Sequence, residues 1–265
     1  MPRIQFIELH EQPGCPSFLR DEITDALQFG LNSLKTYAPI TPLLQSALDS
    51  THSRSIIDMC SGAAGPWLDL SQRLHADAQA SFRILLTDKY PNIGAFEKIK
   101  EASGNQIDFN PGPIDAMNVP VELKGFRTMF TTFHHFSPDE ARAVLQNAVD
   151  AGQGIGIFEV TRRAPATIGL IFLWSLMSLA FTPWIRPFRW SRLVCTYVLP
   201  LIPFVLLFDG LVSCLRAYRP QELREIVATL NATGYEWRIG VHFKARGDLP
   251  ITYLIGCPQA PISVS

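Results

Sequence analysis

Short apolar segments alternate with helical segments between residues 55 and 160, and this alternation limits the possible folds more than any other feature of the sequence. Alternation of this kind predicts a parallel sheet with helices on both faces. Ligands of such sheets bind beyond the carboxyl ends of the strands. The expected strands are residues 55–59, 82–86, 106–109, 126–133 and 154–160, and the expected helices between them are residues 67–74, 95–102 and 137–151.

The segments outside this region complete the predicted architecture. Residues 18–37 and 40–48 read as helices separated at Pro39, residues 220–230 as a further helix, and residues 236–244 and 251–256 as an antiparallel pair. We therefore expect one doubly wound, mostly parallel α/β sheet with a C-terminal antiparallel hairpin and a helical insertion. The predicted parts are an N-terminal helical cap (1–50), a core (51–160 and 219–265) and a hydrophobic, arginine-rich insertion (161–218).

Composition excludes several classes of function. The net charge of −1 provides no field that would attract nucleic acid. Five scattered cysteines lack the spacing of a metal site, so no metal is expected. Charged residues interrupt the N-terminal segment and exclude a signal-peptide pattern there, so a cytoplasmic location is the default expectation.

The stretch SRSIIDMCSGAAGPWLDL, residues 53–70, places a run of small residues directly after a strand that ends in Asp58. Small residues let a ligand approach the backbone, and amides at the start of the following helix can donate to it. The run from Cys60 to Gly65 lacks the G-x-G-x-x-G pattern of dinucleotide sites. It is compatible with a compact ligand without a pyrophosphate, or simply with a tight turn.

Two further acids follow the next two expected strands. Asp88 lies 30 residues after Asp58, where a carboxylate can accept both hydroxyls of a ribose. Asp115 can accept from an exocyclic adenine amine, and the Ala116 amide can donate to a ring nitrogen. Each acid alone is compatible with an ordinary turn, but three in order on successive strand ends favour a nucleoside-containing ligand.

The series IIDMCSGAAG, LLTDKYPN, PIDAMNVP and FRTMFTTFHHF resembles the class I S-adenosylmethionine-dependent methyltransferases. The resemblance is close over about residues 50–160, and residues 219–257 resemble the ending of that fold. The whole chain also resembles a bacterial group of such proteins with a hydrophobic insertion. The resemblance implies S-adenosylmethionine as cofactor.

By motif position, the resemblance assigns cofactor binding to Asp58, Gly62, Asp88, Asp115 and Ala116. The sequence departs from the family at Cys60 and Ala64, which stand where the loop usually has its first and third glycines. We extend the expected cofactor-binding set to the neighbours Cys60, Ser61, Ala63, Lys89 and Thr132.

Catalytic candidates follow the fourth and fifth strands. His134 or His135 could act as a base because imidazole titrates near neutral pH, or could only shape the pocket. Glu159 is a weaker candidate at the next strand end. Asp209 in the insertion either pairs with Arg216 or faces the acceptor as a base. The N-terminal segment, which often covers the substrate in this fold, adds three candidates that the sequence does not rank: Glu8, His10 and Tyr37.

The insertion contains two long uncharged runs, residues 164–185 and 193–208. Between them, PWIRPFRWSR alternates Trp184 and Trp190 with arginines, a pattern typical of membrane interfaces. The region 160–221 holds seven arginines and one acid, a net charge of +6. A spanning hairpin, a hairpin in one leaflet, and a lid or dimer face all remain open. The sequence favours the one-leaflet hairpin, docked on anionic lipid by Arg186, Arg189 and Arg192.

The expected function is methyl transfer from S-adenosylmethionine to a hydrophobic small-molecule or lipid-like acceptor, at the inner face of the membrane. One alternative is a membrane-associated module that binds the cofactor without turnover. Another is a nucleotide-dependent oxidoreductase, which the missing glycine-rich pyrophosphate loop disfavours. The sequence sets neither the methylated atom nor the oligomeric state.

Overall fold

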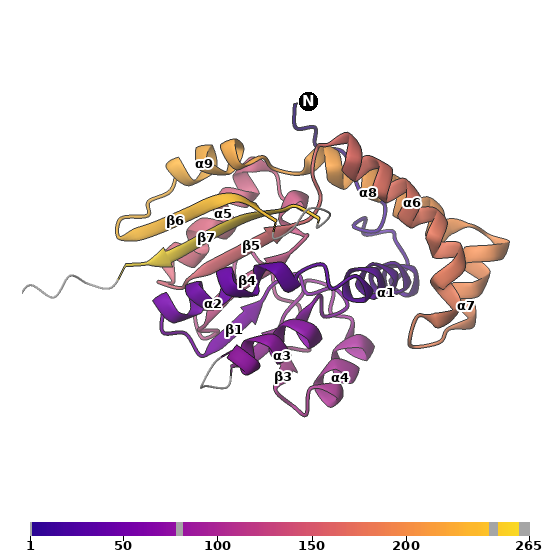
Figure 1. The fold of residues 1–265 in the computed structure, drawn as a ribbon, viewed down its shortest axis with the longest axis horizontal. Helices are drawn as coiled ribbons and strands as arrows, with labels where there is room; N and C mark the ends of the chain where they lie inside the picture. Colours follow the sequence, from indigo (N-terminus) through magenta and orange to yellow (C-terminus); the bar gives the residue numbers. More distant parts are fainter. Residues whose placement is uncertain (1, 78–81, 244–248, 260–265) are drawn as a thin grey trace, which may run out of the picture. The chain divides into compact units, whose positions relative to one another are not determined.

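A computed structural model describes residues 2–77, 82–243 and 249–259 (Figure 1). The chain divides into two compact units, and each is built from two separate stretches of sequence. We call Met1–Leu34 with Thr161–Tyr218 the hairpin unit, and Lys35–Val160 with Arg219–Ser265 the sheet unit. The expected N-terminal cap, residues 1–50, is therefore divided, since residues 35–50 belong to the sheet unit.

Within the described residues, the sheet unit contains a seven-stranded sheet in the order β3-β2-β1-β4-β5-β7-β6 (Figure 1). β1 to β5 run parallel, and β7 pairs antiparallel with both β5 and β6. This arrangement confirms the predicted mostly parallel sheet with its C-terminal antiparallel pair. The strands are β1 Ser55–Asp58, β2 Arg83–Leu86, β3 Ile107–Phe109, β4 Phe126–Phe130, β5 Ile155–Glu159, β6 Tyr235–His242 and β7 Ile251–Pro258.

Helices connect these strands as the sequence predicts. The best-defined start is that of α5, where the Ser137 side chain accepts from the Glu140 amide and the Glu140 side chain accepts from the Ser137 amide. The helices of the sheet unit are η1 Ala38–Ile40, α2 Thr41–Ser50, α3 Trp67–Asp77, α4 Ile93–Ala102, η2 Phe133–His135, α5 Pro138–Asp150 and α9 Pro220–Ala228.

Two expected elements are shorter in the structure. The fourth strand ends at Phe130 because Thr131 has a positive φ of 49°, and residues 133–135 form a 3₁₀ turn instead of strand. The first helix ends at Ser33, and Lys35 with φ 48° reverses the chain before Tyr37. Lys244, the expected end of β6, lies outside the described residues.

The hairpin unit is helical. Its core contains buried residues of the first helix and of the insertion, among them Ile23, Ala26, Ile202 and Val205. Its elements are α1 Ser17–Ser33, α6 Pro165–Phe181, η3 Thr182–Trp184, α7 Trp190–Leu193, η4 Val194–Val198 and α8 Leu201–Arg216.

The structure corrects the expected role of two arginines in the insertion. The Arg192 side chain is buried, forms an ion pair with Asp25 of α1, and donates to the Pro187 carbonyl at 2.7 Å. The guanidinium nitrogens of Arg189 lie 3.9 Å from a carboxylate oxygen of Asp21 and 4.0 Å from one of Asp25. The prediction that both present free charge to a membrane is wrong, because the acids that offset them come from α1, more than 160 residues earlier.

The segment Pro165–Trp184 is long and apolar enough to cross a membrane. Only 22% of an 18-residue stretch within it is buried. The helical segments Trp190–Val198 and Leu201–Arg216 reach the length and apolarity of a membrane span only when they are taken together, and a bend of 76° separates them. Length and composition alone do not separate a span from a helix that lies at a membrane surface.

Candidate functional site

The sequence-predicted residues of the sheet unit share one edge of the sheet. In the register of the parallel strands, Asp58 pairs with Leu86 and with Thr128, and Phe130 pairs with Phe158. The loops that leave β1, β2, β4 and β5 therefore begin side by side. Parallel α/β sheets bind ligands at this edge.

Asp58 braces the loop that follows it. Its side chain is 1% exposed, and its two oxygens accept from the hydroxyls of Thr128 and Ser61, each at 2.7 Å. Burial raises the pKa of this carboxyl to about 7, although the two hydroxyl donors oppose the shift. A contact of Asp58 with a ligand stays a prediction; the structure shows a carboxyl that fixes Ser61.

The loop from Cys60 to Gly65 has left-handed backbone at four positions. The φ angles are 54° at Cys60, 56° at Gly62, 76° at Ala64 and 49° at Gly65. Cys60 and Ala64 therefore adopt the conformation that glycine adopts most easily. The loop keeps a glycine-like backbone at both positions where the sequence departs from the family.

Asp88 joins the first two loops. Its carboxylate accepts from the Gly62 amide and from the Tyr90 amide, both at 2.8 Å. A carboxylate has about four acceptor positions, so two remain for further donors. The side chain is half-buried. These properties fit a group that accepts the two hydroxyls of a ribose.

Asp115 belongs to the third loop, which is tied to the second by a hydrogen bond from the Ile114 amide to the Asp88 carbonyl at 2.8 Å. The Asp115 carboxylate accepts from Lys89 at 3.1 Å and from the Met117 amide at 2.9 Å. The bond to Asp115 raises the pKa of Lys89. Asp115 and Lys89, both in the expected cofactor-binding set, therefore contact each other, a contact that the sequence did not predict, and the next residue, Ala116, is buried.

His134 and Glu159 form a buried pair at the ends of β4 and β5. The Nδ1 atom of His134 lies 2.7 Å from one Glu159 oxygen, and the Phe133 amide donates to the other at 2.7 Å. Burial alone would raise the pKa of Glu159, but His134 and the Phe133 amide hold it below its ordinary value. Sequence reasoning selected both residues without predicting that they touch.

The remaining candidates beside this pair have simpler surroundings. The His135 ring is half-buried, with its centroid 4.2 Å from that of His134. Thr132 begins the 3₁₀ turn, and within the described residues its buried hydroxyl has no hydrogen-bond partner. Tyr37 is buried against Thr131, and burial raises the pKa of its phenol, so the phenol stays protonated near neutral pH.

Asp209 belongs to the hairpin unit, and the alternative that pairs it with Arg216 is not the one found. Its carboxylate accepts from the Leu9 amide at 2.7 Å and contacts Nδ1 of His10 at 2.7 Å. Arg216 instead lies 2.6 Å from Glu11, with Glu8 at 3.4 Å. The partners of Asp209 and Arg216 therefore come from residues 8–11 of the N-terminal segment. The sequence pattern did not predict that this segment packs against α8.

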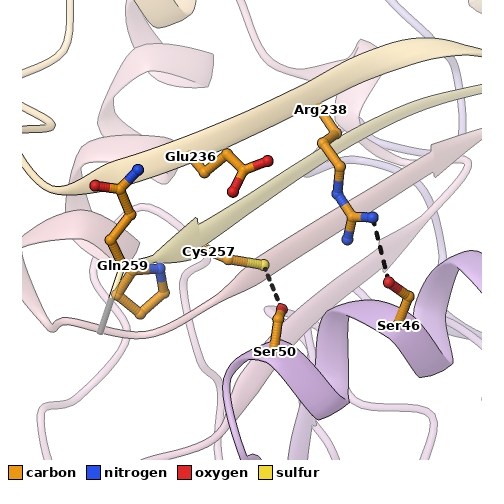
Figure 2. Close-up of a pocket in the computed structure, with 7 residues that line it drawn as sticks. Ser46, Ser50, Glu236, Arg238, Cys257 and Gln259 are labelled. Carbon is orange, nitrogen blue, oxygen red and sulfur yellow. Dashed lines mark hydrogen bonds between the residues drawn. The ribbon is translucent and has the colours of Figure 1, made fainter. Parts of the chain in front are cut away.

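A separate cavity of about 330 Å³ lies between α2 and the β6–β7 pair (Figure 2). In it, Arg238 donates to Ser46 at 3.3 Å and Ser50 donates to the Cys257 sulfur at 3.5 Å. Because Gly256 pairs with Ile155 at the start of β5, this cavity lies toward the end of the sheet opposite Glu159. It is distinct from the strand-end site, and sequence reasoning did not select its residues.

No protein-family model matches the sequence, and no curated protein matches it. Solved structures do match. A protein described as an O-methyltransferase from Nostoc punctiforme aligns with 96% of this chain at 11% identity and a TM-score of 0.53. The S-adenosylmethionine-dependent methyltransferase SibL aligns with 95% at 15% identity and a TM-score of 0.51. Human N-acetylserotonin methyltransferase, solved with S-adenosylmethionine, aligns with 97% at 13% identity and a TM-score of 0.51.

These likenesses establish the fold, which is the class I methyltransferase fold that the sequence predicts. The chain spans a little under two thirds of each of these structures: 64%, 61% and 63% of their lengths.

Proposed function

We propose that the protein is an S-adenosylmethionine-dependent methyltransferase that acts on an apolar small-molecule or lipid-like acceptor at a membrane surface. The class I fold and the linked loops after β1, β2 and β3 support the cofactor assignment. The observation that carries the catalytic assignment is the buried His134–Glu159 pair at the same edge of the sheet.

The residues at the strand ends fit the cofactor. Asp88 would accept the ribose hydroxyls with its remaining acceptor positions, and Asp115 with Ala116 would hold the adenine. The left-handed loop around Gly62 lets the ligand approach the backbone. When bound, S-adenosylmethionine supplies a methyl group on a positively charged sulfur, which makes that carbon open to attack by a nucleophile.

His134 would take the proton of the acceptor. Glu159 stays ionised because its pKa lies below the ordinary value, so the Nδ1 atom of His134 must carry a proton and donate it. In the neutral imidazole with its proton on Nδ1, Nε2 carries the lone pair and would act as a general base toward a hydroxyl or amine. The Phe133 amide holds the other Glu159 oxygen and fixes the direction of the pair.

The apolar acceptor is supported by the hairpin unit. Residues 165–184 contain no charged side chain, and only 22% of an 18-residue stretch within them is buried. An acceptor that partitions into lipid would be collected where such a segment meets a membrane.

The test is to incubate the full chain with S-adenosylmethionine labelled in its methyl group and a bacterial lipid extract. We expect label in an organic-soluble product, which mass spectrometry then identifies. Cofactor binding by calorimetry without any labelled product, across lipid and aqueous extracts, would instead support a binding module without turnover.

Substitution of His134 by Asn should lower kcat by about 10²- to 10⁴-fold, the usual contribution of a general base, with little change in cofactor affinity. His52→Asn is the matched control, since His52 is exposed in the same unit. Equal and small effects of both substitutions on kcat would show that His134 only packs.

Substitution of Asp88 by Ala should weaken cofactor binding by about 10- to 150-fold, because a hydrogen-bonding charged group contributes about 1.5–3 kcal/mol. Asp108→Ala, at an exposed carboxylate of β3, is the control. Calorimetry with S-adenosylmethionine measures both. Unchanged affinity in Asp88→Ala would contradict the ribose assignment.

A further inference from the structure

Helix α6 has its polar side chains inside and its apolar side chains outside. Ser175 and Ser178 are buried, as is Thr182 in the following turn. A helix at the surface of a water-soluble domain shows the opposite pattern. The exposed side chains of α6 include Leu170, Phe172, Leu173, Leu176, Met177 and Leu179, each at least 40% exposed.

The buried polar groups of α6 are satisfied inside the hairpin unit. Ser175 donates to the Pro203 carbonyl at 2.6 Å, and Thr182 donates to the Ser178 carbonyl at 2.7 Å. α6 and α8 also approach closely, since a Cβ atom on Gly210 would lie 2.7 Å from Ile171. Small residues and hydroxyls between helices, with apolar residues outside, are the packing mode of helices in lipid.

The exposed apolar surface continues through the connection between α6 and α8. Trp184 and Trp190 are 65% and 75% exposed, and Arg186 lies exposed between them. Tryptophan beside arginine is typical of the boundary between lipid and water. The surface extends to Phe188, Val194, Tyr197, Val198, Leu199, Leu201, Phe204 and Phe208.

The contacts of helix α1 argue against a hairpin that crosses a bilayer. Asp25 of α1 forms the ion pair with Arg192, and Glu22 accepts from Ser191. These contacts join α1 to the connection between α6 and α8. A hairpin that crossed the bilayer would have to carry these acids of α1 with it, at a large cost in free energy.

We propose that the outward apolar surface of residues 165–208, the docking surface, inserts into one leaflet of a lipid bilayer while α1 remains on the aqueous side. Binding is driven mainly by apolar contact, because Arg189 and Arg192 are occupied by acids of α1. This inference specifies the membrane part of the proposed function and does not depend on methyl transfer.

The test is flotation of the full chain with neutral phosphatidylcholine vesicles. We expect the parent to float, and Phe172→Gln with Leu176→Gln to lower the partition coefficient at least tenfold, since two exposed apolar side chains are lost. Val121→Gln with Phe243→Gln is the control, because these side chains of the sheet unit are 67% and 65% exposed. The control should float like the parent.

Anionic lipid should add little. Phosphatidylglycerol should strengthen binding by about fivefold at low salt, the effect of one arginine near the surface, and Arg186→Gln should remove this increment. A parent that ignores neutral vesicles and binds only anionic ones would overturn the apolar mechanism.

Two other results would overturn the docking surface. The parent could remain in solution with vesicles and sediment as a dimer that Phe172→Gln with Leu176→Gln converts to monomer, so that a second copy covers the surface. Alternatively, Arg186→Cys could react with a membrane-impermeant maleimide added outside bacterial spheroplasts, above the background of the parent, so that the hairpin spans. Calorimetry with S-adenosylmethionine on the same Phe172→Gln/Leu176→Gln protein should match the parent, which separates failure of docking from failure of the cofactor site.

Discussion

The loop after β1 shows how single residues adapt to a backbone that usually needs glycine. Cys60, Gly62, Ala64 and Gly65 all have positive φ, a conformation that the two glycines tolerate and that is unusual for Cys60 and Ala64. Left-handed backbone costs a non-glycine residue about 1–2 kcal/mol. The loop therefore carries local strain at two positions, and the surrounding hydrogen bonds of Ser61 and Asp58 hold it in place.

We predict a large effect for one substitution in this loop and a small effect for another. Gly62→Ala should lower the free energy of unfolding by about 1–2 kcal/mol through backbone strain. Ala64→Gly should change it by less than about 1 kcal/mol, because strain relief and the larger entropy of the unfolded chain oppose each other. Urea denaturation measures both, and equal losses would contradict the role of φ.

Asp58 should make stability fall as pH rises. Its folded pKa of about 7 exceeds the unfolded value near 3.9, so the folded state binds the proton more tightly. The stabilisation is present below about pH 4 and is lost between about pH 4 and 7. Asp58→Asn should remove this slope, which denaturation of both proteins across that range will measure. A parallel pH dependence of the two proteins would show that Asp58 titrates normally.

The sequence predicted which residues lie at the strand ends because each follows an apolar strand. It did not predict what they contact. Asp58 holds Ser61 and Thr128, and Glu159 holds His134, through a register that only the folded sheet defines. The end of β4 before Thr131 was not predicted, because a positive φ at a β-branched residue has no local sequence signal.

At the scale of helices, counting charge along the sequence overestimated the free charge of the insertion. The acids that offset Arg189 and Arg192 lie on α1, where a local composition window does not include them. Helix periodicity cannot identify the outer face of α6, since its polar residues Ser175 and Ser178 are buried. The predicted bounds of the insertion, residues 161–218, rest on uncharged runs that interrupt an otherwise regular alternation.

The Arg192–Asp25 pair should be important for stability. Arg192→Gln should lower the free energy of unfolding by about 3–5 kcal/mol, because it leaves a buried carboxylate without its partner. Arg186→Gln, at an exposed arginine, should stay within about 0.5 kcal/mol of the parent. Chemical denaturation compares the two.

Replacement of both partners provides the second arm of this prediction. Arg192→Met with Asp25→Leu should recover most of the loss, since neither member of this pair then leaves the other buried without its partner. A double variant as unstable as Arg192→Gln would indicate that the bonds from Arg192 to the Ile185 and Pro187 carbonyls dominate instead.

At the scale of the whole molecule, neither compact unit is continuous in sequence. The fold class was predicted because the core segments 51–160 and 219–257 keep their strand and helix patterns. The division of residues 1–50 was not, because it depends on buried polar contacts such as His10 with Asp209, about 200 residues apart. Periodicity reports which face of a segment is apolar but not which distant segment covers it.

The contact between His10 and Asp209 should make the hairpin unit sensitive to pH. Burial lowers the pKa of His10, but the carboxylates of Asp209, Glu8 and Glu11 raise it above the ordinary value of 6.5. The resulting stabilisation is complete below about pH 6.5 and is lost as pH rises through the folded pKa.

We therefore expect the stability advantage of the parent over His10→Gln to shrink between pH 6 and pH 9. Arg216, which lies close to Glu8 and Glu11, stays charged over this whole range. Chemical denaturation of both proteins at pH 6 and pH 9 measures this advantage. Limited proteolysis after Arg20 at the same pH values reports on the hairpin unit. His52→Gln is the control, and an advantage that grows with pH would contradict the sign of the shift.

The position of the hairpin between β5 and α9 also sets an order of events during synthesis. β5, residues 155–159, acquires its antiparallel neighbour only when residues 251–258 have been made. In the interval the ribosome delivers the entire apolar segment 165–208. The nascent chain thus exposes its most lipid-like surface while one edge of its sheet is still open. If the proposed docking surface inserts into lipid at this stage, it is shielded from other chains before β7 completes the sheet, and membrane docking becomes a step in folding.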